Sequence, residues 1–249
     1  MATKRLSLAV VTADDKAATG GLTATGKMPW YSYSLPAQEC QVGGRLRQIE
    51  GSVCRKCYAF KGNYVWPSVR AAQYRRLEAL RADPTGWADA MTRTLKRLAR
   101  KFVPTDSDPW PAHRWHDAGD LQGAWHLDAI CRVAWGTLRV RVADQSRKAI
   151  RHWLPTREYG IIEEWMGAAG QLPPNLNIRL SAHMVDGPLP QTLARKYGLT
   201  VSGVATPEGA AGYEADGANL CPAYDQGGEC RSCRSCWDKK VPAVVYPIH

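Results

Sequence analysis

Eight cysteines are the side chains of this 249-residue sequence whose spacing most clearly indicates chemistry. A C-x2-C step lets two thiolates reach one ion, and four thiolates complete a tetrahedral zinc site. The same spacing also serves a 4Fe–4S cluster. The sequence therefore predicts a metal-binding subregion over residues 219–240, with zinc preferred and iron–sulfur as the alternative. Its ligands are Cys221, Cys230, Cys233 and Cys236, and His249 is an alternative to Cys221.

A second group, Cys40, Cys54 and Cys57, stands in the first quarter of the chain. Three thiols could form a second metal site with a fourth, non-cysteine ligand, or contribute to the C-terminal one. Radical S-adenosylmethionine enzymes use three cysteines, and Cys54-x2-Cys57-Tyr58 matches half of their pattern. Cys40 stands too far upstream to complete it. Cys131 lies in a helix-like run and is interpreted as a core thiol.

Two carboxylates flank a short turn in W-H-D-A-G-D-L-Q, residues 115–122. Carboxylates held close together push each other's proton affinities apart, so one can stay ionised while the other acts as an acid. An ionised carboxylate can also attack the anomeric carbon of a sugar. We predict Asp117 and Asp120 as catalytic residues, with helix capping as the alternative role of each.

Further polar residues follow the segments predicted as strands. Ligands bind at the carboxyl ends of parallel strands, so these positions are candidates for substrate binding. Arg157 and Glu158 could instead form an ion pair that braces a loop, and His183 is either a general base or a neutral core histidine. The predicted substrate-binding residues are His116, Gln122, Arg157, Glu158, Ser202 and Gly203.

Strand-like and helix-like segments alternate from residue 113 onward, and this order is typical of a parallel sheet with helical crossovers. We expect one domain over 1–249, an α/β fold that is a complete or incomplete (β/α)-barrel, with an open doubly wound sheet as second choice. Residues 136–149 could be a strand or an extension of the preceding helix. The expected strands are 113–117, 150–154, 176–180 and 199–204, and the expected helices are 124–134, 161–166 and 189–197.

The N-terminal part has a different character. Residues 5–12 predict a strand, 13–67 an irregular insertion that contains cysteines, and 68–101 a helix. The chain has 33 Lys and Arg against 23 Asp and Glu, a net charge of +10, which favours a polyanionic partner such as nucleic acid. A solvated helix face is the alternative. The predicted nucleic-acid-binding residues on that helix are Arg93, Lys96, Arg97, Arg100 and Lys101.

The quoted motifs, with V-C-R-K-C-Y-A-F-K-G-N-Y at 53–64 and W-L-P-T-R-E-Y at 153–159, resemble a phage-encoded family related to tRNA-guanine transglycosylases, the deazaguanine DNA transglycosylases (DpdA-like). Residues 117–122 are similar to D-S-G-G-F-Q of that superfamily, and 154–157 are similar to its L-P-T-R. The superfamily nucleophile precedes L-P-T-R by three residues. Here Arg151 stands at that position.

The resemblance implies exchange of guanine in DNA for a free 7-deazaguanine base of the preQ0 type, with zinc as the metal. Because Arg151 cannot act as the nucleophile, Asp117 is the preferred candidate and Asp120 the second carboxylate. A radical S-adenosylmethionine or other iron–sulfur enzyme on a partial barrel is the first alternative. A non-catalytic zinc protein that binds nucleic acid is the second. We expect a cytoplasmic protein without a membrane span, because the sequence has no long apolar run, and the oligomeric state is left open.

Overall fold

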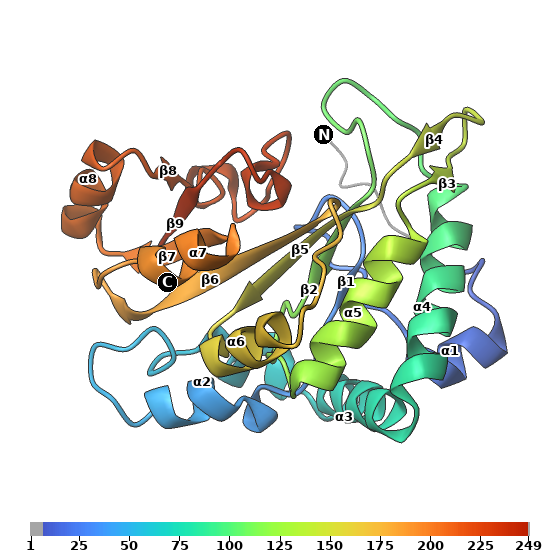
Figure 1. The fold of residues 1–249 in the computed structure, drawn as a ribbon, viewed down its shortest axis with the longest axis horizontal. Coiled ribbons are helices and arrows are strands. Elements are labelled where there is room, and N and C mark those ends of the chain that lie inside the picture. Colours follow the sequence, from blue (N-terminus) through green and yellow to red (C-terminus); the bar gives the residue numbers. More distant parts are fainter. Residues whose placement is uncertain (1–6, 249) are drawn as a thin grey trace.

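The computed structural model describes residues 7–248, and its centre is a seven-stranded parallel sheet in the order β1-β2-β5-β6-β7-β9-β8. Apart from the last two strands, neighbours in the sheet follow one another along the chain. Each crossover therefore moves one strand along in the same direction (Figure 1). The expected parallel α/β sheet flanked by helices is confirmed. The seven strands are β1 (Ser32–Tyr33), β2 (Ala112–Trp115), β5 (Arg151–Thr156), β6 (Leu176–Val185), β7 (Thr200–Ala205), β8 (Asn219–Leu220) and β9 (Ala243–Pro247).

Helices connect the strands, and their caps explain several of the boundaries. The Asp83 carboxylate accepts a hydrogen bond from Gly86 N at 2.9 Å, and Pro84 follows at the first helical position. The expected helix over 68–101 is therefore two helices that meet at residue 83. The α-helices are α1 (Ala13–Thr19), α2 (Gln41–Leu46), α3 (Pro67–Ala82), α4 (Pro84–Ala99), α5 (Ala124–Gly136), α6 (Tyr159–Gly167), α7 (Gln191–Tyr197) and α8 (Pro207–Ala215).

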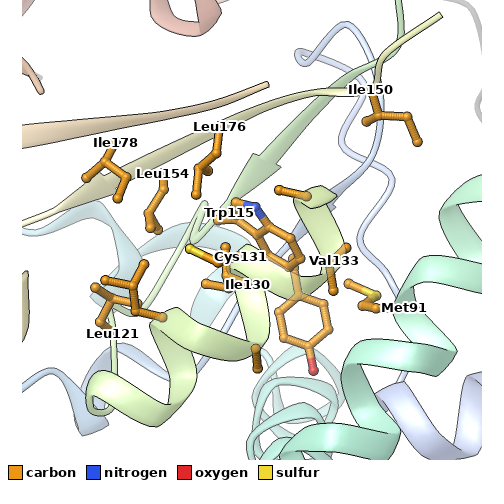
Figure 2. Close-up of a cluster of buried hydrophobic side chains, with 14 of the residues drawn as sticks. Met91, Trp115, Leu121, Ile130, Cys131, Val133, Ile150, Leu154, Leu176 and Ile178 are labelled. Atoms are coloured by element: carbon orange, nitrogen blue, oxygen red, sulfur yellow. The ribbon is translucent and has the colours of Figure 1, made fainter. Parts of the chain in front are cut away.

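The two faces of the sheet are covered differently. On one face, Trp115, Leu154 and Ile178 pack against α4 and α5 in a single apolar core, as Figure 2 shows. A smaller cluster on the other face joins Trp153 to Trp237, from the segment between β8 and β9. In Figure 1 this last segment, in red, lies on the opposite side of the sheet from α5 and α6. We call its face the polar face of the sheet, because it also carries polar side chains of β2, β6 and β7.

The N-terminal region departs most from expectation. Residues 7–12 form turns rather than the expected strand, and the start of that strand lies outside the described residues. Within 13–67, β1 pairs with β2 and so belongs to the main sheet, although the rest is short helices and turns. The segment 136–149 closes with a small antiparallel pair, β3 (Val140–Arg141) and β4 (Arg147–Lys148). The segment is therefore neither one continuous strand nor an extension of α5, the two alternatives that the sequence left open.

The other expected strands and helices from residue 113 onward are present, with boundaries shifted by a few residues. The short 3-10 helices are η1 (Ala37–Glu39), η2 (Tyr58–Phe60), η3 (Gly62–Val65), η4 (Tyr224–Gln226) and η5 (Ser235–Trp237). Among residues 7–248, the helices are all too short or too polar to cross a membrane.

Candidate functional site

Three cysteines lie together at the carboxyl edge of the sheet, in the long connection after β1. Cys40 is the N-cap of α2, and the chain then returns so that Cys54 and Cys57 stand beside it. Gly51 and Val53 anchor the returning segment to β6, where Val53 N donates to His183 O at 2.9 Å and Val185 N donates to Gly51 O at 2.9 Å. The insertion between Cys40 and Cys54 is therefore folded back, which brings distant cysteines together.

A glycine leaves space between two of these sulfurs. A Cβ atom at Gly43 would lie 3.5 Å from Cys54 Sγ and 3.8 Å from Cys40 Sγ. The adjacent Gly44 faces open space instead. Burial raises the pKa of the Cys40 and Cys54 thiols, and the nearby Arg157 opposes the rise at Cys54. The donor set is therefore sulfur-rich, partly enclosed and next to a positive charge, as a metal or iron–sulfur site requires.

Glu158 holds the segment that carries Cys40. Its Oε1 accepts hydrogen bonds from Gln41 N at 3.1 Å and Val42 N at 2.8 Å, in the first turn of α2. A carboxylate at that position satisfies amides that have no partner within the helix. Gln122 adds a second brace, because its Nε2 donates to Glu39 O at 3.2 Å. The structure thus places both predicted substrate-binding residues in positioning roles, and Glu158 is not paired with Arg157.

Both carboxylate oxygens of Asp120 accept hydrogen bonds from neighbouring residues. Oδ1 accepts from Thr156 Oγ1 at 2.6 Å and from Leu121 N at 2.8 Å, and Oδ2 accepts from Arg157 N at 3.0 Å. These bonds fasten the loop after β2 to the end of β5. Burial still raises the pKa of Asp120, although these bonds oppose the rise. Its geometry is that of a structural carboxylate, which differs from the predicted catalytic role.

Asp117 lies at the same edge of the sheet and has a carboxylate oxygen without a hydrogen-bond partner. Its side chain is 3% exposed, Oδ2 accepts from the Tyr64 hydroxyl at 3.3 Å, and Oδ1 has no partner. The Tyr58 hydroxyl donates to the Asp117 backbone carbonyl. Burial raises the pKa of both tyrosines, so each keeps its proton and remains a donor. A buried acceptor without a partner is costly, which makes Asp117 Oδ1 a position for a ligand's donor.

Arg114 lies on β2, on the polar face, with few acceptors. Its guanidinium stands 4.5 Å from the centre of the Trp153 ring. Its contacts are Tyr58 Oη at 3.4 Å and Met28 Sδ at 3.8 Å, and Nε is buried without a partner. Sequence reasoning missed Arg114 and both tyrosines. The one signal for Tyr58 was its place directly after Cys57.

A pocket of about 260 Å³ opens beside the three cysteines, at the end of β6. Tyr159 and His183 stack there at 4.5 Å, and Met184 and residues 188–190 complete the lining. His183 O is the acceptor for Val53 N, so the pocket adjoins the cysteine segment. Arg157 donates from Nε to Ala182 O at 3.2 Å, next to this pocket. A larger groove of about 690 Å³ runs along α5 and α6, and none of the predicted site residues lines it.

The remaining predicted substrate-binding residues are dispersed. His116 is buried against His126, with ring centroids 5.2 Å apart, and so faces the helical core. Ser202 bonds Ser181 at 3.1 Å on the polar face. A Cβ on Gly203 would meet Leu189, so this glycine faces the opposite side. Arg151, at the position of the superfamily nucleophile, begins β5 and lies at the other end of that strand from Arg157.

The C-terminal cysteines gather on the polar face. Cys236 is buried with Trp153 and Trp237, and Cys221 and Cys230 pack against the same cluster. Cys233 N donates to Cys230 O at 2.9 Å. The alternative ligand His249 lies outside the described residues. Across residues 7–248, no three His, Cys, Asp or Glu side chains stand in an arrangement that could hold a metal ion.

The basic residues of α4 serve two different purposes. Arg93 and Arg97 pair with the carboxylate of Asp15, which is 3% exposed, and thereby join α4 to α1. Two guanidinium groups against one carboxylate leave a net positive charge, and both arginine side chains remain partly exposed, so their role in nucleic-acid binding stays a prediction. Exposed on the same helix and just beyond it are Lys96, Arg100 and Lys101.

Comparison with known proteins gives one match. A family model described as Gene product 88 (GP88) matches residues 6–239. No curated protein and no solved structure matches the chain.

Proposed function

Since the chain belongs to the Gene product 88 family, whose description states no reaction, we propose a function from the site itself: an iron–sulfur enzyme of the radical S-adenosylmethionine type. Cys40, Cys54 and Cys57 would hold the cluster. The observation that carries this proposal is the gathering of these three thiols at the carboxyl edge, directly after the first strand of a parallel sheet.

The donor set fits such a cluster. The three thiolates would hold three of the irons and leave the fourth open to a ligand. With an electron from an external one-electron reductant, a cluster of this kind would supply the reductive cleavage of the S-adenosylmethionine sulfonium into methionine and a 5′-deoxyadenosyl radical. Gly43 leaves the room next to two sulfurs that a side chain would fill, and the charge of Arg157 favours the thiolate of Cys54. Glu158 and Gln122 position the segment that carries Cys40.

We propose further that the sheet is an incomplete (β/α)-barrel whose polar face borders the reaction site. The near-consecutive strand order supports this arrangement. Nucleic acid is the proposed substrate class, supported by the net charge of +10 and by the exposed bases of the α4 region. In this arrangement, Asp117 Oδ1 would bind a polar group of the co-substrate or substrate.

Anaerobic reconstitution with iron and sulfide tests the proposal. We expect a brown protein with about four irons per chain at this site, an electron paramagnetic resonance signal after reduction, and a change of that signal on adding S-adenosylmethionine. The double variant Cys54→Ser/Cys57→Ser should lose this signal. Cys131→Ser, which alters a buried thiol of α5, is the control that should keep it.

Two neighbouring glycines give a sharper comparison. Gly43→Ala places a methyl group against Cys40 and Cys54, whereas the methyl group of Gly44→Ala meets no atom within 4 Å. Both changes favour the helix by about 1 kcal/mol, but the new Cβ of Gly43→Ala also lies 3.1 Å from Cys40 Cβ, so the free energy of unfolding of each variant is measured beside its iron content. We expect Gly43→Ala to lose iron and Gly44→Ala to keep it. A colourless wild-type protein after reconstitution, or equal iron in the two variants, would refute the proposal.

Base exchange in DNA is the second candidate, and the free oxygen of Asp117 favours it. The Asp117 carboxylate would attack the anomeric carbon of a guanosine, guanine would leave, and a free deazaguanine base would then displace the carboxylate. The enzyme would have to extrude the target base from the stack. Zinc rather than iron would then be the metal of this protein.

Labelled guanine or deazaguanine incubated with DNA and the protein separates the two candidates. Base exchange predicts incorporation without a reductant, and its loss in Asp117→Asn. The iron–sulfur proposal predicts no incorporation under these conditions and formation of 5′-deoxyadenosine after reduction. Tyr64→Phe removes only the 3.3 Å bond to Asp117 Oδ2 and serves as the mild companion variant.

A further inference from the structure

The four C-terminal cysteines lie among arginines that lack a carboxylate partner. Arg179 is fully buried and donates only to backbone carbonyls, those of Val201 at 2.7 Å and of Ser235 and Val241 at 3.1 Å. Arg114 meets only a phenol and a thioether. Within residues 7–248, neither guanidinium has a carboxylate within 4.0 Å. Arg179 therefore holds a positive charge away from water without a carboxylate partner, which is costly. Arg114 has no direct ion pair either, although the more distant carboxylate of Asp117 favours its charge.

Thiols of the C-terminal segment lie close enough to both guanidinium groups to interact with them electrostatically. Arg114 acts on Cys221 and Cys230, and Arg179 acts on Cys236, where in each case burial raises the thiol pKa and the arginine opposes the rise. No Asp or Glu is among the charges that act on these three thiols. Arg234 is a third nearby base, but it is already paired with Asp108.

The segment between β8 and β9, which carries these cysteines, has little regular secondary structure of its own. Between β8 and β9 it contains only two 3-10 helices, η4 and η5. It is fixed to the sheet by Trp237 Nε1 donating to His113 O at 2.7 Å and by Asn177 Nδ2 donating to Cys236 O at 2.9 Å. A cross-link among its sulfurs would order the part between β8 and Cys236, as a structural metal does in small segments.

We infer that Cys221, Cys230, Cys233 and Cys236 bind one zinc ion on the polar face of the sheet, with Arg114 and Arg179 offsetting the negative charge of the four thiolates. Four thiolates around a divalent ion carry a net charge of two minus, which the guanidinium groups of Arg114 and Arg179 would offset. The anionic zinc–thiolate complex, rather than the ion alone, would then be the charge partner of the two arginines on this face of the sheet. This inference uses none of the cysteines assigned to the iron–sulfur site.

Metal analysis of cysteine variants tests the assignment. We expect about one zinc per chain in the purified protein, retained in Cys54→Ser/Cys57→Ser and in Cys131→Ser, and lost in Cys230→Ser/Cys233→Ser. If the last variant does not fold, the wild-type protein substituted with Co²⁺ decides the matter. The thiolate-to-cobalt charge-transfer band and the intense visible bands of a tetrahedral sulfur site should then appear at one equivalent.

Zinc affinity of arginine variants tests the counter-charge. In competition with a chromophoric chelator, Arg114→Gln should bind zinc about 10- to 100-fold more weakly, and Arg114→Lys should stay close to wild type because it keeps the charge. Arg157→Gln, beside the other cysteine group, is the matched control and should not change the affinity. Absence of zinc, zinc that survives Cys230→Ser/Cys233→Ser, iron and sulfide at these residues, or wild-type affinity in Arg114→Gln would each overturn the inference.

Discussion

Four buried histidines should make the folded protein sensitive to mild acid. His113, His116, His126 and His152 are at most 3% exposed and lie in two neighbouring pairs between β2, α5 and β5. Burial lowers the pKa of all four, to about 3 for His113 and His116. The unfolded chain binds protons at these groups near pH 6.5, whereas the folded chain does not. Stability is therefore fully present above pH 6.5 and is lost as the pH falls toward 3.

The expected loss is large. A histidine whose pKa falls from 6.5 to about 3 on folding costs about 1.4 kcal/mol of stability at pH 5.5 relative to pH 7.5. His113 and His116 together cost roughly 3 kcal/mol, a large part of the whole stability of many domains, and His126 and His152 act in the same direction. Denaturation by urea at the two pH values, followed by tryptophan fluorescence, measures the difference in the free energy of unfolding.

One substitution isolates a single histidine. His116 has a positive φ of 54°, a conformation that asparagine adopts readily, so His116→Asn removes the imidazole without a new backbone cost. We expect the loss of stability between pH 7.5 and 5.5 to shrink by about 1.4 kcal/mol in this variant. Gln145→Asn, at an exposed position with φ 66°, is the control and should behave as wild type.

Two carboxyl groups act in the opposite direction. Burial raises the pKa of Asp120 and Glu158, so their contribution to stability falls as the pH rises through their folded values. This offset is common to wild type and to His116→Asn, and it cancels in their difference. Equal pH dependence in wild type and His116→Asn would refute the reasoning, as would a wild-type stability that does not change between the two pH values.

Further substitutions test the site's construction. Gly119→Ala, at φ 83° and with its new Cβ 2.6 Å from Leu35 Cβ, should lower the free energy of unfolding by about 2 kcal/mol or more in urea titrations. Glu158→Ala removes the acceptor at the start of α2 and should cost about 1 kcal/mol together with iron bound near Cys40, whereas Glu158→Gln should keep more of both. Alanine at the exposed bases should weaken DNA binding and reduce the slope of log affinity against log salt by about 0.9 for each phosphate that is no longer neutralised, without a change in melting temperature. These bases are Lys96, Arg100 and Lys101.

The parallel sheet was predictable because its strands are short apolar runs buried between layers. Residues 176–180 and 199–204 carry that pattern directly, and the structure places strands there. The N-terminal part could not be predicted in the same way. β1 has two residues, and its place in the sheet depends on pairing with β2 rather than on its own pattern. The break between α3 and α4 was visible in Asp83-Pro84, a capping residue followed by a helix-initiating proline.

The site was predictable in residue type more than in role. Asp117 and Asp120 look equivalent in sequence, but only tertiary contacts show that Thr156 and Arg157 satisfy Asp120. The spacing of Cys40 likewise departed from the pattern of radical S-adenosylmethionine enzymes, because a spacing rule assumes a short loop. The hydrogen bond from Val53 N to His183 O holds the chain where it comes back toward Cys40, so the assumption of a short loop does not hold.

Some polar side chains at this edge of the sheet are already hydrogen-bonded within the protein and others are not, and this difference indicates which of them can take part in chemistry. Asp120 and Glu158 use their lone pairs on amides and a hydroxyl, and a reaction that used either would release a loop or a helix end. Asp117 Oδ1 and the three thiols hold no loop or helix end in place, and they lie in the loops that follow β1 and β2. A buried polar group without a hydrogen-bond partner is destabilising unless a ligand supplies one. Asp117 Oδ1 and the three thiols are therefore the first candidates for contact with a substrate. Substitution of Asp117 should therefore alter ligand binding while stability rises or stays level, the reverse of what substitution of Asp120 should do.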